Sequence, residues 1–470
     1  MNPNQEEHLT TPTEGIDALA PHGVIRGLVI MAVAAIVSLL VYNVLPYEEN
    51  ANKGIAFVLF VGILWLTEAV HITLTALMIP LLAVALKMPD TNMTKALAGF
   101  ANPIIFLFLG GFALATALHV QKIDRKIANG IIKAAGSNMF TAVIALAAVT
   151  AFLSMWISNT ATAVMMLPLA LGMMDSLDKD DKRTRAFIML VIAYSANIGG
   201  MGTLVGSPPN AIAAAALDIS FTDWLPYGLP MMLVLMPVMF VTMYFIFRPK
   251  LGKIKQEVAA EVIPWTPRRK LTIVVFLITA LAWIFGDFLK DLGISSPDTF
   301  VALAAIVAVV TLGLANWGQV SDNTDWGVLL LFGGGITLST LMQSSGASMA
   351  MGNQIATTFG TAHPLVIILV VTAFIVFLTE FTSNTASAAL LVPVFGTIGV
   401  QLGLPEQVLV MVIALGASCA FMLPVATPPN AVVFGTGLVT QRDMFKAGLV
   451  LNILCIAIVA LFAHFLWEVL

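Results

Sequence analysis

The chain has 470 residues, of which 59% are apolar and only 10% are charged, and its mean hydropathy is +0.96. Because an ordinary soluble domain carries about 25% charged residues, this composition excludes a soluble globular protein and indicates a polytopic membrane protein. The formal net charge is −4, and no nucleic-acid partner is expected. Cys419 and Cys455 match neither a metal-binding spacing nor a disulfide framework. We expect both to pack as small apolar residues.

The chain begins with a polar, mildly acidic segment, residues 1–23, that has no basic stretch before an apolar core. We therefore expect a short cytosolic tail rather than a cleaved signal peptide. A membrane-spanning helix needs about 20 mostly apolar residues. The segments that meet this need are 24–42, 54–68, 71–87, 103–119, 186–216, 228–247, 270–289, 298–314, 325–342, 407–437 and 445–468. The sequence thus predicts an all-α polytopic membrane protein with eleven transmembrane helices.

Two further apolar segments, 140–174 and 364–400, each contain one Ser-Asn-Thr sequence near the middle. Polar residues that interrupt a helix at membrane depth are tolerated where they line a cavity or bind something. Each segment therefore fits a pair of half-length helices better than a full span. We expect two re-entrant helical hairpins.

Short sequence words occur twice in this chain. Ser-Asn-Thr-Ala stands at residues 158–161 and 383–386, an offset of 225 residues. Pro-Pro-Asn-Ala stands at 208–211 and 428–431, an offset of 220. A third pair, Leu-Gly-Gly at 109–111 and Phe-Gly-Gly at 332–334, is offset by 223. The chain therefore carries one unit twice.

The basic residues indicate which loops face the cytoplasm, because cytoplasmic loops carry an excess of Lys and Arg. With the N-terminus inside, the inner loops hold 18 of the 22 basic residues, and the outer loops hold only Lys53, Lys87, Lys95 and Lys290. This asymmetry is kept only if each hairpin enters and leaves on one face. The first hairpin opens to the cytoplasm and the second opens outward. The sequence predicts inverted-topology repeats, which suit alternating access and favour a transporter over a channel.

The repeated words could bind ions of both signs. Ser, Asn and Thr cap helix N-termini, where free N–H groups and the helix dipole favour an anion. Two successive prolines should break the spans 186–216 and 407–437 and free carbonyls near Gly206 and Ala426, which suit a small hard cation. A single Ser-Asn-Thr is more often an ordinary helix cap, but two copies in matched context favour binding sites. On this layout no Lys or Arg lies at mid-membrane, so a bound polyanion needs co-bound cations.

Few ionisable residues lie in apolar sequence. Glu68, His71 and Glu380 stand at scattered positions, whereas an enzyme would need a nucleophile with a base, or a metal cluster. We therefore expect no enzymatic activity. Glu380 precedes Ser383 by three residues, and its counterpart in the first repeat is Met155. A structural hydrogen-bonding role and a coupling role for Glu380 both stay open.

The paired Ser-Asn-Thr words, the two Pro-Pro-Asn breaks and the Phe-Leu-Thr-Glu-Phe-Thr-Ser-Asn-Thr run at 377–385 resemble the divalent anion/sodium symporter family, the sodium-coupled dicarboxylate carriers. This resemblance covers about 50–468. It implies import of a C4 dicarboxylate such as succinate, malate or fumarate with at least two sodium ions and no organic cofactor. The implied substrate-binding residues are Ser158, Asn159, Thr160, Ser207, Pro208, Ser383, Asn384, Thr385, Thr427 and Pro428. The implied sodium ligands are Ser154, Ser158, Asn159 and Gly206 in the first site, and Thr379, Thr382, Asn384 and Ala426 in the second.

The resemblance also implies a homodimer and an elevator-type movement. The scaffold would consist of 24–139 and 248–363. The transport domain would consist of 140–247, with the inward-opening hairpin, and 364–470, with the outward-opening hairpin. Transport or exchange of another divalent or trivalent anion, such as citrate, sulfate or 2-oxoglutarate, is the alternative function. We expect a lipid-embedded protein, in a bacterial inner membrane, with a cytoplasmic N-terminus.

Overall fold

The computed structural model describes residues 21–175, 177–178, 180–252, 262–359 and 362–467. The cytosolic tail expected at 1–23 lies outside the described residues up to residue 20. Helices and the loops between them make up the described part of the chain, which contains no strand. The expected all-helical fold is confirmed. Cys419 and Cys455 are both buried and free, as expected for packing residues.

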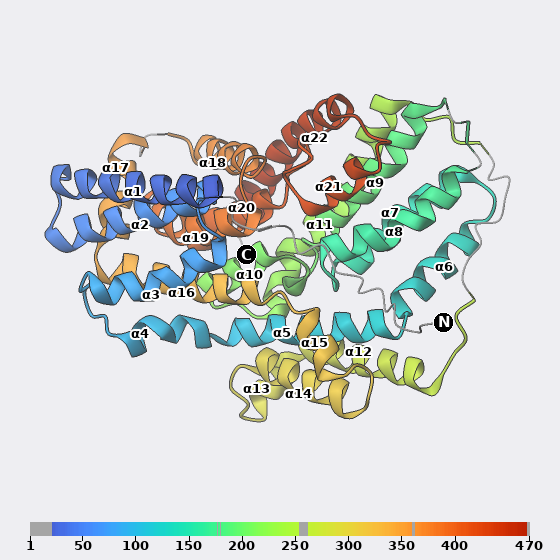
Figure 1. Cartoon of the computed structure of the whole chain (residues 1–470), viewed down its shortest axis with the longest axis horizontal. Coiled ribbons are helices and arrows are strands. Elements are labelled where there is room, and N and C mark those ends of the chain that lie inside the picture. The colour runs from blue at the N-terminus through green and yellow to red at the C-terminus, as the bar shows by residue number, and fades with distance from the viewer. Residues whose placement is uncertain (1–20, 176, 179, 253–261, 360–361, 468–470) are drawn as a thin grey trace.

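The helices follow one another in the same order in the two halves of the chain (Figure 1). After α1 (Pro21–Val44), the first half consists of α2 (Glu49–Thr67), α3 (Ile72–Ala85), α4 (Met93–Ala98) with the 3₁₀ turn η1 (Gly99–Ala101), α5 (Pro103–Val120), α6 (Ile123–Ala135), α7 (Met139–Ser154), α8 (Asn159–Met174), α9 (Lys182–Gly199), the 3₁₀ turn η2 (Leu204–Gly206), α10 (Pro208–Leu217) and α11 (Phe221–Phe247). The second half consists of α12 (Pro267–Ile284), α13 (Gly286–Asp291), α14 (Pro297–Thr311), α15 (Trp317–Asp322), α16 (Trp326–Ser344), α17 (Ala347–Phe359), α18 (Pro364–Leu378), α19 (Asn384–Gln401), α20 (Glu406–Ala417), α21 (Pro428–Gly435) and α22 (Gln441–Phe462), which continues into the π-helical turn η3 (Ala463–Trp467).

Both expected hairpins form as pairs of helices, α7–α8 and α18–α19. Ser158 and Ser383 cap the second helix of each pair, because their hydroxyls accept hydrogen bonds from Ala161 N at 3.2 Å and Ala386 N at 3.4 Å. The capping role expected for the Ser-Asn-Thr word is therefore confirmed. Six helices in the described residues are long and apolar enough to cross a membrane alone, and several others are apolar but shorter. The number of eleven spans stays a prediction.

Both Pro-Pro words begin a new helix after a break, as expected. In each case the prolines occupy the first turn of α10 or α21, where a missing N–H costs nothing. The breaks are longer than the prolines alone would make them, because α9 already ends at Gly199 and α20 at Ala417. Residues 200–207 and 418–427 form two irregular linkers.

Two 13-residue helices, α6 and α17, lie in segments that the sequence predicts as loops. They occupy matching places, each between a long helix and a hairpin. α6 is amphipathic, with Arg125 and Lys126 in its first turns, and α17 contains several polar residues. Neither helix has the continuous apolar sequence of a membrane span, and the expectation of loops was wrong for this reason.

The duplication extends to the helices before the hairpins. The indole of Trp65 in α2 donates to Ile72 O at 3.1 Å, and the indole of Trp283 in α12 donates to Asp298 O at 3.0 Å. The first bond ties the end of α2 to the start of α3, and the second ties the end of α12 to the start of α14, past the short helix α13. The two helices α5 and α16 also pack alike, each through a close-packed glycine.

Those glycines correct one detail of the repeat alignment. A Cβ on Gly110 would lie 2.6 Å from Ala302 Cβ in α14, and a Cβ on Gly334 would lie 2.7 Å from Ala76 Cβ in α3. Gly110 therefore corresponds to Gly334, an offset of 224 rather than the 223 given by the matched words. The matched words had paired Gly110 with Gly333, one residue before its structural counterpart.

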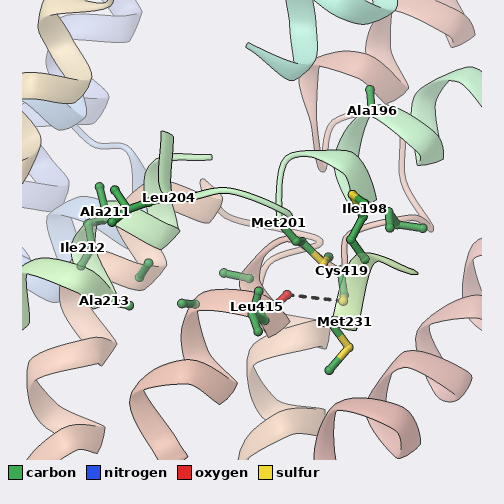
Figure 2. Packing of buried hydrophobic residues seen from close by; sticks show 14 of the residues in the cluster. Ala196, Ile198, Met201, Leu204, Ala211, Ile212, Ala213, Met231, Leu415 and Cys419 are labelled. Atoms are coloured by element: carbon green, nitrogen blue, oxygen red, sulfur yellow. Dashed lines mark hydrogen bonds between the residues drawn. The ribbon is translucent and has the colours of Figure 1, made fainter. Parts of the chain in front are cut away.

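The two hairpins lie on opposite sides of the broken helices along the long axis of the molecule (Figure 1). The hairpin α7–α8 packs against α9, and the hairpin α18–α19 packs against α20. Their second helices also cross between the halves, since α8 contacts α21 and α19 contacts α10. Figure 2 shows buried apolar residues around the first break, where Met201 of the linker lies near Cys419 of the second half. Both breaks are thus enclosed by residues from both halves.

Replacing Gly199 by Ala should destabilise the protein. A Cβ there would lie 2.4 Å from Ala151 O and 2.5 Å from Ala151 Cα, so α7 and α9 would have to separate. We expect a loss of about 1–3 kcal/mol, as for other overpacked sites, measured as a lower midpoint of thermal unfolding in detergent. Gly130→Ala in α6 is the matched control, because nothing lies within 4 Å of its Cβ position. Equal midpoints for the two variants would contradict the close packing of α7 on α9.

Candidate functional site

The first hairpin and α9 bring three oxygens together at the hairpin tip. Ser154 ends α7 and Asn159 begins α8, and the Ser154 Oγ lies 2.6 Å from Asn159 Oδ1 and 2.7 Å from Ala196 O. Ser154 is fully buried. A hydroxyl has one proton, so it donates to only one of these two acceptors. The Asn159 amide can supply the other proton through its Nδ2, or its Oδ1 can face a cation together with the hydroxyl and the carbonyl.

The second hairpin repeats this cluster. The Thr379 hydroxyl is hydrogen-bonded to Asn384 Oδ1 and lies 3.0 Å from Ala417 O at the end of α20. Thr379 is fully buried, like Ser154. Hydroxyl, amide and helix-end carbonyl thus occur in the same arrangement in both halves. Each cluster gathers neutral oxygen atoms from a hydroxyl, a side-chain amide and a backbone carbonyl.

Gly200 and Gly206 bring the first break close to this cluster. The position that a Cβ on Gly200 would occupy lies 2.5 Å from Asn159 Oδ1 and 3.0 Å from Gly206 O. Two oxygens therefore face one small space that only a glycine leaves open. Gly206 was a proposed ligand position from the sequence, and its carbonyl lies on this space.

The Asn residues of the two Pro-Pro-Asn words hold the linkers in place. Asn210 Nδ2 donates to Gly200 O at 2.9 Å and Thr203 O at 2.8 Å. Asn430 Nδ2 donates to Ala420 O at 3.1 Å and Leu423 O at 3.0 Å. In each half one side-chain amide satisfies two carbonyls that the interrupted helix has released. Both residues belong to the repeated word, but the sequence alone did not assign them this role.

Asn197 of α9 links the first half to the second break. Its Nδ2 donates to Thr427 Oγ1 at 3.0 Å and contacts Asn430 Oδ1 at 3.4 Å. The sequence gave no signal for this residue, because its counterpart in the second half is Ser418. Among the described side chains, the buried Ser418 hydroxyl has no hydrogen-bond partner.

The residues expected to contact a substrate differ in exposure. Ser158 and Pro428 are exposed, and Asn159, Thr160, Pro208 and the tip residues 383–385 are half-buried. Ser207 and Thr427, in contrast, are buried. A ligand between the tips would therefore reach the Ser-Asn-Thr residues and the prolines more readily than the two residues before the prolines.

Two of the expected second-site ligands are not joined to the Thr379 cluster by hydrogen bonds. Thr382 Oγ1 donates to Leu378 O at 3.0 Å and pairs with Ser387 Oγ at 2.7 Å, both within the hairpin. Ala426 is buried, and its N–H donates to Leu423 O at 3.2 Å. Conversely, the carbonyls of Ala196 and Ala417 belong to the clusters and were not foreseen. Ala417 is the last residue of α20, and Ala196 lies in the last turn of α9, where its carbonyl also accepts a hydrogen bond from Gly200 N at 3.1 Å. Both helices end earlier than the prolines suggest.

The surroundings of the site contain little formal charge. Among the side chains whose exposure is described, no Lys or Arg is buried. No group of three or more His, Cys, Asp or Glu side chains gathers in the described part of the chain. The acceptors in both clusters are neutral oxygens, and the N-termini of α8 and α19 add the positive ends of two helix dipoles.

Glu380 is the charged residue nearest to the second cluster along the chain, and it is fully buried. Its carboxylate accepts hydrogen bonds from Phe421 N at 2.8 Å, Met422 N at 2.9 Å and Leu423 N at 3.0 Å. Asn452 Nδ2 of α22 donates to the same group at 2.7 Å. The structural hydrogen-bonding role considered for Glu380 is therefore present. It fixes the linker of the second break.

Replacing either linker asparagine should lower stability. Asn210→Ala or Asn430→Ala removes the donor of one buried carbonyl, Gly200 O or Ala420 O, and an unsatisfied buried group costs about 1–3 kcal/mol. The carbonyls of Thr203 and Leu423 keep hydrogen bonds from Gly206 N and Ala426 N. We expect a midpoint of thermal unfolding several degrees below wild type for both variants. Asn323→Ala is the control, since this exposed side chain makes one bond at a surface helix end, and its effect should stay within about 0.5 kcal/mol. A normal midpoint for Asn430→Ala would show that the linkers do not depend on these amides.

Comparison with known proteins gives consistent matches over nearly the whole chain. The family model described as the sodium:sulfate symporter transmembrane region matches residues 23–470. An uncharacterized transporter of Haemophilus influenzae is 54% identical over 435 residues, covering 90% of this chain and 94% of its own. The sodium-dependent dicarboxylate transporter SdcS of Staphylococcus saprophyticus is 32% identical over 489 residues, covering 94% and 91%.

Solved structures show a likeness in fold. The YdaH transporter of Alcanivorax borkumensis has a TM-score of 0.59 at 15% identity, covering 84% of this chain and 99% of its own. MtrF of Neisseria gonorrhoeae, described among antimetabolite efflux pumps, has a TM-score of 0.57 at 14% identity, covering 96% of both chains. The fold is that of a helical membrane transporter.

Proposed function

Because the chain belongs to the sodium:sulfate symporter family, we propose that it imports C4 dicarboxylates such as succinate, malate and fumarate by coupling their movement to sodium ions. The family match bears out the resemblance seen in the sequence. The relatives named sodium-dependent dicarboxylate transporter favour a dicarboxylate as the substrate. One structural observation carries the proposal, namely the pair of matched oxygen clusters at the hairpin tips.

A cation explains both clusters. In each one a hydroxyl, a side-chain amide and a backbone carbonyl lie together, and such neutral oxygens suit a small hard cation. We assign the first sodium to Ser154, Ser158, Asn159 and Gly206, with the Ala196 carbonyl added. We assign the second to Thr379, Thr382, Asn384 and Ala426, with the Ala417 carbonyl added.

The anion is assigned to the space between the two tips. The N-termini of α8 and α19, the Ser-Asn-Thr side chains and Pro208 and Pro428 supply dipoles, hydroxyls and amides. Since no described Lys or Arg is buried, none of them compensates two carboxylates at this depth. The sodium ions then provide most of the balancing charge, and this makes transport depend on sodium.

Alternating access is supported by unequal packing of the two halves. The helix α19 packs against α2 and α16, whereas the main contacts of its counterpart α8 are with α7, α9 and α21. A Cβ on Gly335 would lie 3.3 Å from Ala389 Cβ, while Val164, which corresponds to Ala389, is 50% exposed. Gly111, which corresponds to Gly335, contacts Val205 instead.

Val205 itself has a counterpart, Val425, that is 82% exposed. If the two halves exchange conformations, the Val164 side chain packs against Gly111 and the Val425 side chain packs against Gly335. We therefore propose an elevator-type movement of 140–247 and 364–470 against a scaffold of 24–139 and 248–363. We also propose the inverted orientation of the repeats, a homodimeric assembly and a bacterial inner membrane, with the N-terminus in the cytoplasm.

A second candidate substrate class rests on the family description, which names sulfate. Sulfate, citrate and 2-oxoglutarate are all polyanions that a site built from dipoles and sodium could accept. Competition of labelled succinate uptake by each anion separates them. Inhibition by sulfate at lower concentration than by malate or fumarate would favour sulfate.

The main prediction concerns transport by the purified protein in liposomes. We expect uptake of labelled succinate to rise severalfold with an inward sodium gradient relative to the same potassium gradient, because the anion site lacks charge without sodium. Liposomes without protein are the control. Equal uptake in sodium and potassium would refute sodium coupling.

The movement can be tested with paired cysteines in a background where Cys419 and Cys455 are replaced by Ala. Gly335→Cys with Ala389→Cys places two Cβ atoms close to the usual disulfide separation of about 3.8 Å. Oxidation should form this bond directly in the described conformation and abolish uptake, because α19 can no longer leave α16. Reduction should restore uptake.

The corresponding pair, Gly111→Cys with Val164→Cys, is the matched control for the movement. It should cross-link only when the protein samples the other state, so its rate should change when sodium and succinate are added. Full transport by the oxidised first pair would exclude sliding of α19 along α16.

A further inference from the structure

Basic residues gather where α5 ends and α12 begins. Residues 119–130 and 262–275 contain one acidic residue, Asp124, whose carboxylate is already bonded to His119 at 2.9 Å. The same two segments contain six basic residues, namely Lys122, Arg125, Lys126, Arg268, Arg269 and Lys270. In a membrane protein, such a density of basic residues marks the boundary between water and lipid, and it attracts anionic lipid headgroups.

Hydrogen bonds hold these two segments together. Arg269 Nε of α12 donates to Gln121 O at 2.8 Å, and Lys126 Nζ of α6 donates to Ile263 O. The Lys126 ammonium also lies over the Trp265 ring, 4.5 Å from its centroid. Two of the basic side chains therefore bind the protein itself and fix the residues that precede α12.

Lys270 lies in a different environment. It is exposed, and no carboxylate of the described residues forms an ion pair with it. Together with Trp265 and Ile273 it lines an open cavity of about 400 Å³. One cation, one aromatic ring and one aliphatic side chain thus form the walls. A ligand that matches these walls has a negative group next to an apolar part.

The cavity lies at the level where the apolar part of α12 begins. No charged residue follows Lys270 in this helix as far as Ile284. Trp265 precedes the helix and is 53% exposed. Because tryptophan and lysine side chains at the ends of membrane helices lie at the level of the headgroups, the cavity is placed to receive one.

An exposed apolar stripe continues from the cavity along α12. Its residues recur three or four positions apart and therefore share one face of the helix, namely Leu271, Val274, Leu277, Ile278 and Leu281. Thr272, Thr279 and Trp283 are buried on other faces. The exposed stripe suits acyl chains that extend from a headgroup in the cavity.

The charge beside the stripe favours an anionic lipid over other occupants. A second copy of the chain, packed symmetrically on this face, would bring two such groups of basic residues together, and like charges repel. A zwitterionic lipid carries its own positive group and would leave the basic residues uncompensated. An anionic lipid satisfies both the charge and the apolar surface.

We propose that the cavity of Trp265, Lys270 and Ile273 binds the headgroup of an anionic phospholipid, whose acyl chains lie along the exposed face of α12. The lipid phosphate pairs with the Lys270 ammonium. Because Trp265 also contacts Lys126, the bound lipid supports the connection between α12 and α6. This inference uses only the membrane location of the chain and does not depend on the transported substrate or on sodium.

Contact quenching of tryptophan fluorescence tests the proposal. The purified full-length protein is placed in phosphatidylcholine vesicles with a minor fraction of phosphatidylglycerol, and one of the two lipids at a time carries brominated acyl chains. The chain has eight tryptophans, so the signal of Trp265 is the difference between wild type and Trp265→Phe. Brominated phosphatidylglycerol should quench this signal severalfold more than an equal fraction of brominated phosphatidylcholine.

Variants of Lys270 test the role of the charge. Lys270→Gln should reduce the preference for phosphatidylglycerol about fivefold, the factor that corresponds to about 1 kcal/mol for one basic residue near anionic lipid. Lys270→Arg should keep the preference. Arg442→Gln is the matched control, because this exposed basic residue stands at the start of α22, outside the cavity. It should leave the preference unchanged.

Three results would overturn the proposal. Equal quenching by the two brominated lipids would show ordinary contact with bulk lipid. Absence of quenching by either lipid would show that protein covers this face, as in contact between two copies of the chain. Relief of the quenching by inorganic phosphate, added at constant ionic strength, would assign the cavity to a soluble anion. None of these results bears on sodium-driven uptake, which is measured separately.

Discussion

The structure depends on how an interrupted helix satisfies its backbone at membrane depth. Where α9 and α20 end early, the released carbonyls have no water to bind, and each would cost several kcal/mol if left alone. Asn210 and Asn430 satisfy two of these carbonyls in each half. The carbonyl of Ala417, at the end of α20, and that of Ala196, in the last turn of α9, lie against the hairpin hydroxyls. Ala196 O also keeps a hydrogen bond from Gly200 N at 3.1 Å, so only the second break places an otherwise unbonded helix-end carbonyl in its cluster.

Much of this arrangement follows from the sequence. The repeated words located both hairpins, the serine caps and both breaks, because proline and small polar residues within apolar sequence cap or interrupt helices. The lengths of the breaks could not be predicted, since no sequence signal marks Gly199 and Ala417 as the last residues of their helices. The carbonyls of Gly200 and Ala420 bond instead to Asn210 and Asn430, ten residues further along the chain. The sequence did not predict α6 and α17, because they do not have the composition of a membrane span.

The site was foreseen in part, and for a physical reason. Residue type alone identifies the side-chain oxygens of Ser154, Asn159, Thr379 and Asn384. These side chains lie together in pairs, as the repeat suggested. Every residue has a backbone carbonyl, so the sequence could not show which residue supplies the third oxygen. The partners of Glu380 were equally hidden, because three of its four donors are backbone N–H groups.

The two halves differ in charge and in packing, and these differences distinguish their two oxygen clusters. Two halves of identical sequence and identical conformation would give their two oxygen clusters the same surroundings. Glu380 in place of Met155 breaks that equality through charge, and the exposed Val164 and Val425 break it through packing. The packing difference belongs to one conformation and reverses when the halves exchange. The charge difference is part of the covalent structure and stays beside the second cluster in every conformation.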